Sequence, residues 1–165
     1  MKMRQATFLA AAAAFTLFTV PAVATPPAGV TGTVVARGDF ADPVDIKFKV
    51  TEGSQEVIHA PNARQTVMQG IVIGPGGHTG WHSHPGPVVV LVKSGELTLY
   101  SDYAGTCTGQ TYTMGQAFID HGQGHVHLGL NSSPSVNTEL WVTYFDVPPG
   151  GAFRIDAADP GSCAF

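Results

Sequence analysis

The stretch Gly76–Gly95 reads GGHTGWHSHPGPVVVLVKSG, and His82 and His84 within it are separated by a single residue. His125 and His127 repeat this spacing further along the chain. Residues i and i+2 of a β-strand point to the same face, so each pair can converge on one ion. Imidazole is a frequent ligand of divalent transition metals. A solvated strand face explains a single pair equally well, but two pairs beside glycine-rich turns predict a metal site.

The sequence on both sides of this stretch is typical of short strands and turns. Residues 44–50 alternate apolar and polar side chains, which is the period of a half-buried strand, and no segment after residue 24 keeps a 3.6-residue apolar period. Twenty glycines and twelve prolines suit many turns. We therefore predict a single all-β domain, a sandwich or barrel. Strands are expected over residues 31–37, 44–50, 65–73, 81–84, 88–92, 96–100, 110–113, 117–120, 125–130 and 139–147.

Length and composition exclude several classes of protein. The 165 residues correspond to one domain, and 44% hydrophobic against 12% charged residues argues against intrinsic disorder. The formal net charge is -4, from 8 basic and 12 acidic residues. A nucleic-acid partner is therefore not expected, because phosphate binding needs a basic face.

Residues 1–24 have the features of a cleavable signal peptide. Lys2 and Arg4 precede an uncharged apolar run, and Ala22-Val23-Ala24 forms a small-x-small cleavage pattern. A membrane anchor is the alternative, but the run is short for a bilayer span of about 20 residues. We expect a secreted or periplasmic protein that has no membrane contact after cleavage.

Cys107 and Cys163 are the chain's two cysteines, and both follow the expected cleavage site. An even number of cysteines in an oxidising compartment favours a disulfide, with two free thiols as the alternative. A bridge between them would tie the C-terminus to the domain and stabilise it by about 4 kcal/mol in the chain-entropy model.

The histidine-rich stretch resembles the first motif of the cupin superfamily, G-x5-H-x-H-x3/4-E-x6-G. Gly76 is followed by five residues and then by His82 and His84, and Gly95 closes the motif. The second cupin motif, G-x5-P-x-G-x2-H-x3-N, is matched at its opening by Gly115 and at its end by residues 127–131.

The second motif departs from the family pattern in its middle. His121 stands where proline is usual, and the spacing to His127 is one residue longer. The extra residue falls in the glycine-rich turn 122–124, where a loop absorbs an insertion easily. The resemblance covers residues 61–147 and extends to small secreted bacterial cupin-domain proteins.

The resemblance implies a jelly-roll β-barrel, also called a double-stranded β-helix, with a metal near one end. It implies His82, His84 and His127 as ligands of one divalent transition metal, which could be Fe, Zn, Ni or Cu. It also divides the chain into a signal peptide at 1–24, N-terminal strands at 25–60, the barrel core at 61–147 and a C-terminal tail at 148–165.

The glutamate of the first motif is missing, because Val88 occupies its position. Two interpretations follow: a three-histidine site, or a site that has lost its metal and become a ligand pocket. Three neutral imidazoles leave the ion its full charge and favour anionic ligands at the open positions. His125 is a candidate fourth ligand from the second pair.

These features support three hypotheses about function. The first is a metal-dependent oxidase, dioxygenase or isomerase acting on a small molecule. The second is a non-catalytic module that binds a small, sugar-like ligand, with a vestigial metal site. The third is a dimerising structural domain, and a homodimer is compatible with all three.

Overall fold

A computed structural model describes residues 24–51 and 56–163 of the chain. The expected signal peptide at residues 1–24 lies outside the described residues, except for Ala24. The described residues form β-strands and turns and contain no helix. No helix long and apolar enough to cross a membrane is therefore found within these two ranges.

The described part of the chain contains ten strands, which differ widely in length. They are β1 (Ala28–Lys49), β2 (Val57–His78), β3 (His82–Ser83), β4 (Val88–Ser94), β5 (Glu96–Tyr103), β6 (Thr106–Thr113), β7 (Ala117–Asp120), β8 (His127–Leu130), β9 (Thr138–Tyr144) and β10 (Ile155–Asp156).

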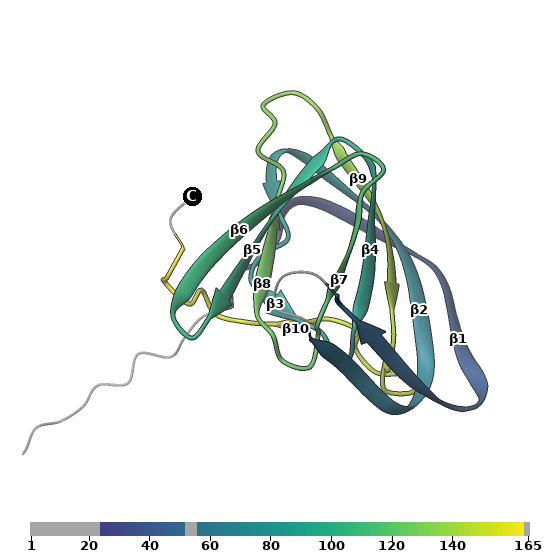
Figure 1. The fold of residues 1–165 in the computed structure, drawn as a ribbon. Helices are drawn as coiled ribbons and strands as arrows, with labels where there is room; N and C mark the ends of the chain where they lie inside the picture. Colours follow the sequence, from purple (N-terminus) through teal and green to yellow (C-terminus); the bar gives the residue numbers. More distant parts are fainter. Residues whose placement is uncertain (1–23, 52–55, 164–165) are drawn as a thin grey trace, which may run out of the picture.

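All strand pairs are antiparallel, and the strands lie in two rows. The first row runs β1–β2–β9–β4–β7, and the second runs β6–β5–β8–β3–β10. The pair His78–Leu130 joins β2 to β8 and so connects the rows. The strands curve around one interior, with β3 and β10 at one end of it (Figure 1). The all-β, cupin-type barrel predicted from the sequence is confirmed.

Alternation along the central strands builds the core. Val88, Val90 and Val92 of β4 are buried and face the interior, whereas Leu91 is 38% exposed. They pack with Leu140 and other apolar side chains of β2, β5 and β9. Antiparallel strands with one face on the core show this pattern of apolar residues at every second position. Val88, Val90 and Leu140 of this core also line the interior cavity beside the histidines.

The structure differs from the predicted strands at both ends of the domain. Residues 31–37 and 44–50 belong to one long strand, β1, whose register shifts between Asp39 and Val44 absorb the irregular segment. The short strand β10 was not predicted, because two residues carry no readable period. Strand β10 brings the C-terminal segment against β3, next to the histidines.

Cys107 of β6 and Cys163 form a disulfide, as the sequence predicts. Their Cα atoms are 5.1 Å apart. Beside the bridge, the Ser162 hydroxyl donates a hydrogen bond to the Asp102 carboxylate at 2.8 Å. These contacts attach the C-terminal segment to the β5–β6 hairpin, and the same segment supplies β10.

Candidate metal centre

His82, His84 and His127 converge at one end of the barrel. His82 lies on β3 and pairs in register with His127 at the start of β8, while His84 follows β3 by one residue. One ring nitrogen of each lies within 4.8 Å of those of the other two. All three side chains are buried. The structure thus brings together the three residues that the motif resemblance named.

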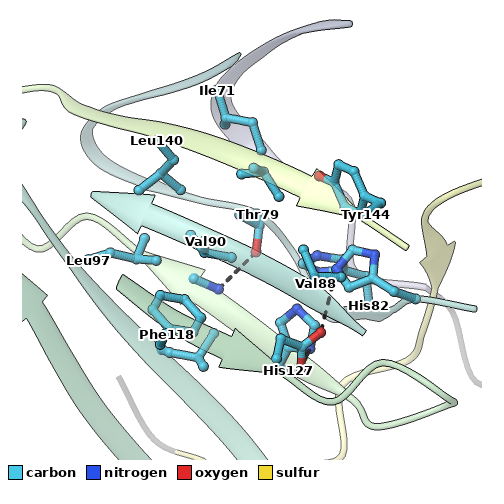
Figure 2. Close-up of a pocket in the computed structure, with 15 residues that line it drawn as sticks. Ile71, Thr79, His82, Val88, Val90, Leu97, Phe118, His127, Leu140 and Tyr144 are labelled. Carbon is cyan, nitrogen blue, oxygen red and sulfur yellow. Dashed lines mark hydrogen bonds and ion pairs between the residues drawn. The ribbon is translucent and has the colours of Figure 1, made fainter. Parts of the chain in front are cut away.

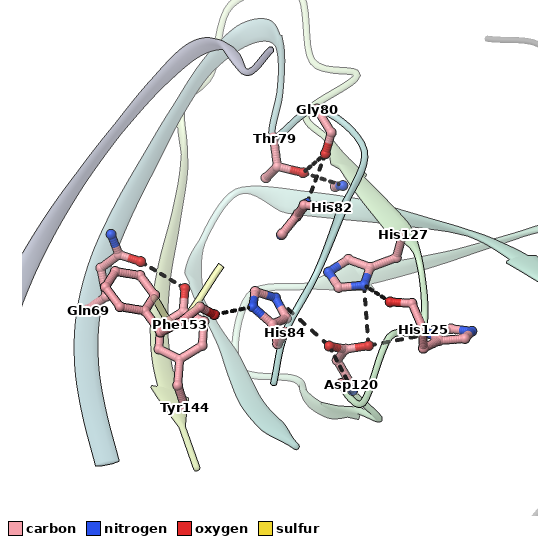
Figure 3. Close-up of polar contacts among 12 residues, drawn as sticks. Gln69, Thr79, Gly80, His82, His84, Asp120, His125, His127, Tyr144 and Phe153 are labelled. Atoms are coloured by element: carbon pink, nitrogen blue, oxygen red, sulfur yellow. Dashed lines mark hydrogen bonds and ion pairs between the residues drawn. The ribbon is translucent and has the colours of Figure 1, made fainter. Parts of the chain in front are cut away.

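Backbone carbonyls orient all three rings. The Nδ1–H groups donate to the carbonyl of Gly80 at 2.9 Å from His82, of Phe153 at 2.7 Å from His84, and of His125 at 3.3 Å from His127 (Figure 3). A carbonyl oxygen only accepts hydrogen bonds, so Nδ1 carries the proton in each ring. The Nε2 lone pairs therefore remain available, which is the arrangement that metal-binding histidines require.

Gly80 shapes the turn that presents His82. Its φ is +69°, and a Cβ there would collide with the Thr25 carbonyl. Only glycine adopts this conformation easily and tolerates such a close approach. The Gly80 amide also donates to Nδ1 of His78 at 3.2 Å, so His78 supports the turn.

The environment keeps the three imidazoles neutral. Burial lowers the pKa of His82 well below its usual range, and nearby His127 and His84 lower it further. Burial, together with His127, lowers the pKa of His84 to about 4. Burial also lowers the pKa of His127, although the Asp120 carboxylate opposes this. Neutral imidazole is the form that binds a metal.

Asp120, at the end of β7, is a candidate site residue that the sequence did not reveal. It is only 4% exposed. Its carboxylate oxygens lie 3.4 Å from Nδ1 of His127 and 3.9 Å from Nε2 of His84. It stands directly opposite Val88 in the register of β4 and β7. Directly opposed residues have Cβ atoms about 5 Å apart on the same face. A carboxylate therefore lies beside the position of the missing motif glutamate.

Asp120 stays ionised despite its burial. Burial by itself would raise its pKa, but His127, His125 and His84 lower it overall. In turn, contact with Asp120 raises the pKa of His125, whose Nδ1 lies 3.6 Å from the carboxylate. A buried carboxylate among imidazoles can bind a cation or hold a proton.

The remaining histidines lie further from the three converging rings. His125 belongs to a second group with Asp120 and His127, on the other side of Asp120 from His84 (Figure 3). His121 contacts Glu56. His59 is exposed and contacts Asp45 at 2.7 Å.

Two cavities border His82 and His84. The first lies inside the barrel, has a volume of about 40 Å³, and is walled by apolar side chains of β4, β5, β7 and β9 in addition to the histidines (Figure 2). A water molecule needs about 10–15 Å³ of such volume, so this space holds only a few waters. The second cavity measures about 300 Å³ and lies against β1, β2 and the C-terminal segment. Only the second has room for a small organic molecule.

Comparison with known proteins supports the fold. No protein-family model matches the chain, and no curated protein matches it. Among solved structures, a cupin domain from Bordetella pertussis is 20% identical over 64% of this chain and 97% of its own, with a TM-score of 0.41. The barrel carries the histidines of both motifs on neighbouring strands. The likeness to the solved cupin domain concerns the fold alone.

Two other solved structures match part of the chain at low sequence identity. An oxalate oxidase is 21% identical over 49% of this chain and 41% of its own, with a TM-score of 0.43. Peruvianin-I, described as a cysteine peptidase from Thevetia peruviana latex, is 19% identical over 78% of this chain and 69% of its own, with a TM-score of 0.49. The chain spans about two fifths of the oxalate oxidase. The function of this protein must therefore be argued from its own site.

Proposed function

We propose that this protein is a metal-dependent cupin in which His82, His84 and His127 hold one divalent transition metal through Nε2. The observation that carries the proposal is the common orientation of the three rings. Each donates Nδ1–H to a backbone carbonyl, and the ring nitrogens gather within 4.8 Å of one another. Each neutral ring keeps one acceptor nitrogen after this bond, and one shared cation would satisfy all three Nε2 lone pairs at once.

The donor set fits such an ion. Three imidazoles suit Zn, Fe, Ni or Cu better than the hard ions Mg or Ca. A catalytic site typically has three protein ligands and leaves further positions open. Metal analysis of protein purified from its native compartment tests the proposal. One equivalent of metal is expected, and metal-free protein that takes up none of the four ions would contradict it.

We further propose that Asp120 replaces the motif glutamate. The proposal is supported by its position opposite Val88 and by its contacts with His84 and His127. From there the carboxylate can bind the ion as a fourth ligand, and the contact with Nδ1 of His127 raises the basicity of that ring. His125, which the sequence nominated for this role, contacts Asp120 instead and would position it.

Oxidation or isomerisation of a small molecule is the activity that such a site favours. A bound ion supplies Lewis acidity and open coordination positions to a substrate. The ionised Asp120 carboxylate is placed to accept a proton beside the site, and Tyr144, which donates to the Gln69 side chain at 2.7 Å, borders both cavities. The apolar interior, with space for only a few waters, limits competing hydrolysis.

The alternative of a sugar-binding module is less well supported. A sugar ring does not fit the interior cavity of about 40 Å³. The larger cavity offers few uncharged polar side chains, among them Gln69 and Thr79, to bond hydroxyl groups. Turnover that depends on the loaded metal separates the two functions, since a binding module has none.

The metal-free protein is expected to lose about 3 kcal/mol of stability between pH 6.5 and pH 4 through His84 alone. The pKa of His84 is about 4 in the folded protein and about 6.5 for an unperturbed histidine. The unfolded chain therefore binds more protons in this window, and folding weakens as the pH falls. The lowered pKa of Asp120 changes the free energy of unfolding below this pH window, and the raised pKa of His125 changes it above the window. Urea unfolding at pH 7 and pH 4.5 measures the change. Equal free energies of unfolding at the two pH values would contradict it.

We propose that the protein is exported and matures by cleavage after Ala24. The disulfide between Cys107 and Cys163 supports an oxidising compartment. N-terminal sequencing of the exported protein is expected to begin at Thr25. An exported chain that still begins at Met1 would overturn this prediction.

A further inference from the structure

The larger cavity is bordered by one permanently charged side chain among the described residues. It measures about 300 Å³, and Arg154 lines it together with His82, His84, Tyr144 and uncharged residues. His82, His84 and Tyr144 also line the interior cavity. A molecule in the larger cavity would therefore lie between Arg154 and the rings assigned to the metal.

Arg154 carries a buried donor that lacks an acceptor. Its Nε donates to the Asp156 carboxylate at 2.7 Å. Its Nη2 is buried, although the side chain as a whole is 28% exposed, and among the described residues it has no hydrogen-bond partner. Most buried polar groups in proteins are paired, so the guanidinium keeps hydrogen-bonding capacity that the described residues do not use.

The backbone fixes Arg154 relative to the histidines. Strand β10, which begins at the next residue, pairs with β3 so that Asp156 stands opposite His82. The carbonyl of Phe153, on the other side of Arg154, accepts the Nδ1–H of His84 (Figure 3).

We propose that Arg154 binds the carboxylate of a small organic acid in the larger cavity, next to the metal ion, and so selects the substrate of this cupin. This inference rests on the proposed metal site. A carboxylate has two acceptor oxygens, so one can accept from the guanidinium while the other faces the imidazoles. The guanidinium is planar and always charged, which makes it the preferred partner of carboxylates in buried sites.

The charge and size of the site favour a small monocarboxylate. Asp156 already engages one edge of the guanidinium, and the other described side chains of the cavity besides histidine are uncharged. A phosphate dianion would bring two negative charges to a cavity whose one permanent cation already pairs with Asp156. A neutral amide would leave the arginine without a counter-charge in the cavity.

The test is an NMR titration of zinc-loaded protein with sodium propionate, propionamide and inorganic phosphate. Propionate is expected to bind at least about tenfold more tightly than propionamide. Arg154→Gln is expected to weaken propionate binding by about 10- to 100-fold, the usual worth of a charge-assisted hydrogen bond, without changing the zinc content. Arg154→Lys should recover only part of the affinity, because it keeps the charge and loses the planar donor group.

Arg64→Gln is the matched control, because it removes the same charge from an exposed residue of β2 and should leave propionate binding unchanged. Unchanged propionate affinity in Arg154→Gln, or tighter phosphate binding in the parent, would overturn the inference. A parent that takes up no zinc overturns the proposed function instead. Propionate is then titrated into the metal-free protein, where binding that depends on Arg154 would support the inference and its absence would overturn it.

Discussion

His84→Ala is expected to lower the affinity for zinc by at least about 100-fold, more than the 10- to 100-fold typical of losing a group that only orients a ligand. His84 offers Nε2 to the ion because its Nδ1–H is committed to the Phe153 carbonyl at 2.7 Å. The remaining two imidazoles compete poorly with water for the ion. Zinc competition against a chromophoric chelator measures the affinity, and His82→Ala and His127→Ala should behave alike.

A control variant separates loss of a ligand from loss of structure. His59→Ala removes an exposed histidine that contacts only Asp45 among the groups described here, and zinc affinity should not change. His84→Ala leaves a small cavity and an unpaired carbonyl, so thermal unfolding of the metal-free variants must accompany the measurement. A folded His84→Ala protein with the zinc affinity of the parent would remove His84 from the site.

The converging histidines could be predicted from the sequence because their signal is local. Two H-x-H pairs, each readable as a strand, together with the glycines of both motifs, point to His82, His84 and His127 without knowledge of strand pairing. The strands were predicted for a similar reason, since alternation over residues 44–50 or 88–92 depends only on neighbours in the chain.

Asp120 could not be predicted in this way, because its role depends on the pairing of β4 with β7. That pairing sets it opposite Val88, some thirty residues earlier in the chain. The only local signal is an acidic residue that shares a strand face with Phe118 at the end of an apolar strand. The sequence therefore indicates that a glutamate is missing from position 88, and the register shows which carboxylate stands beside the gap.

The position of Arg154 beside the histidines could not be predicted from the sequence for a second reason. Strand β10 is two residues long and pairs with an equally short β3, so neither propensity nor periodicity marks it. The disulfide at Cys163 attaches the end of the segment that carries it. Tertiary contacts of this kind, made by a segment with no pattern of its own, are read only from coordinates.

Removing the carboxylate from β7 is expected to weaken metal binding, and adding a carboxylate on β4 is expected to restore it. Asp120→Val should lower zinc affinity by about 10- to 100-fold and manganese affinity further, because hard ions depend more on carboxylate oxygen. Adding Val88→Glu to Asp120→Val should return both affinities to near the parent values, since residues 88 and 120 stand opposite each other on one face.

The double variant also decides how Asp120 acts. If the carboxylate binds the ion, a glutamate at position 88 can replace it, as in the cupin motif. If Asp120 only orients His127 through its Nδ1, 3.4 Å away, a carboxylate on the neighbouring strand does not rebuild that contact and affinity stays low. Val88→Glu alone is the control. It places two carboxylates side by side in a buried space, where like charges disfavour each other. The metal-free variant should therefore be less stable than the parent, and metal binding should restore its stability. Metal titrations and thermal unfolding of all four proteins give the answer, and a double variant that binds no better than Asp120→Val would exclude Asp120 as the replacement for the motif glutamate.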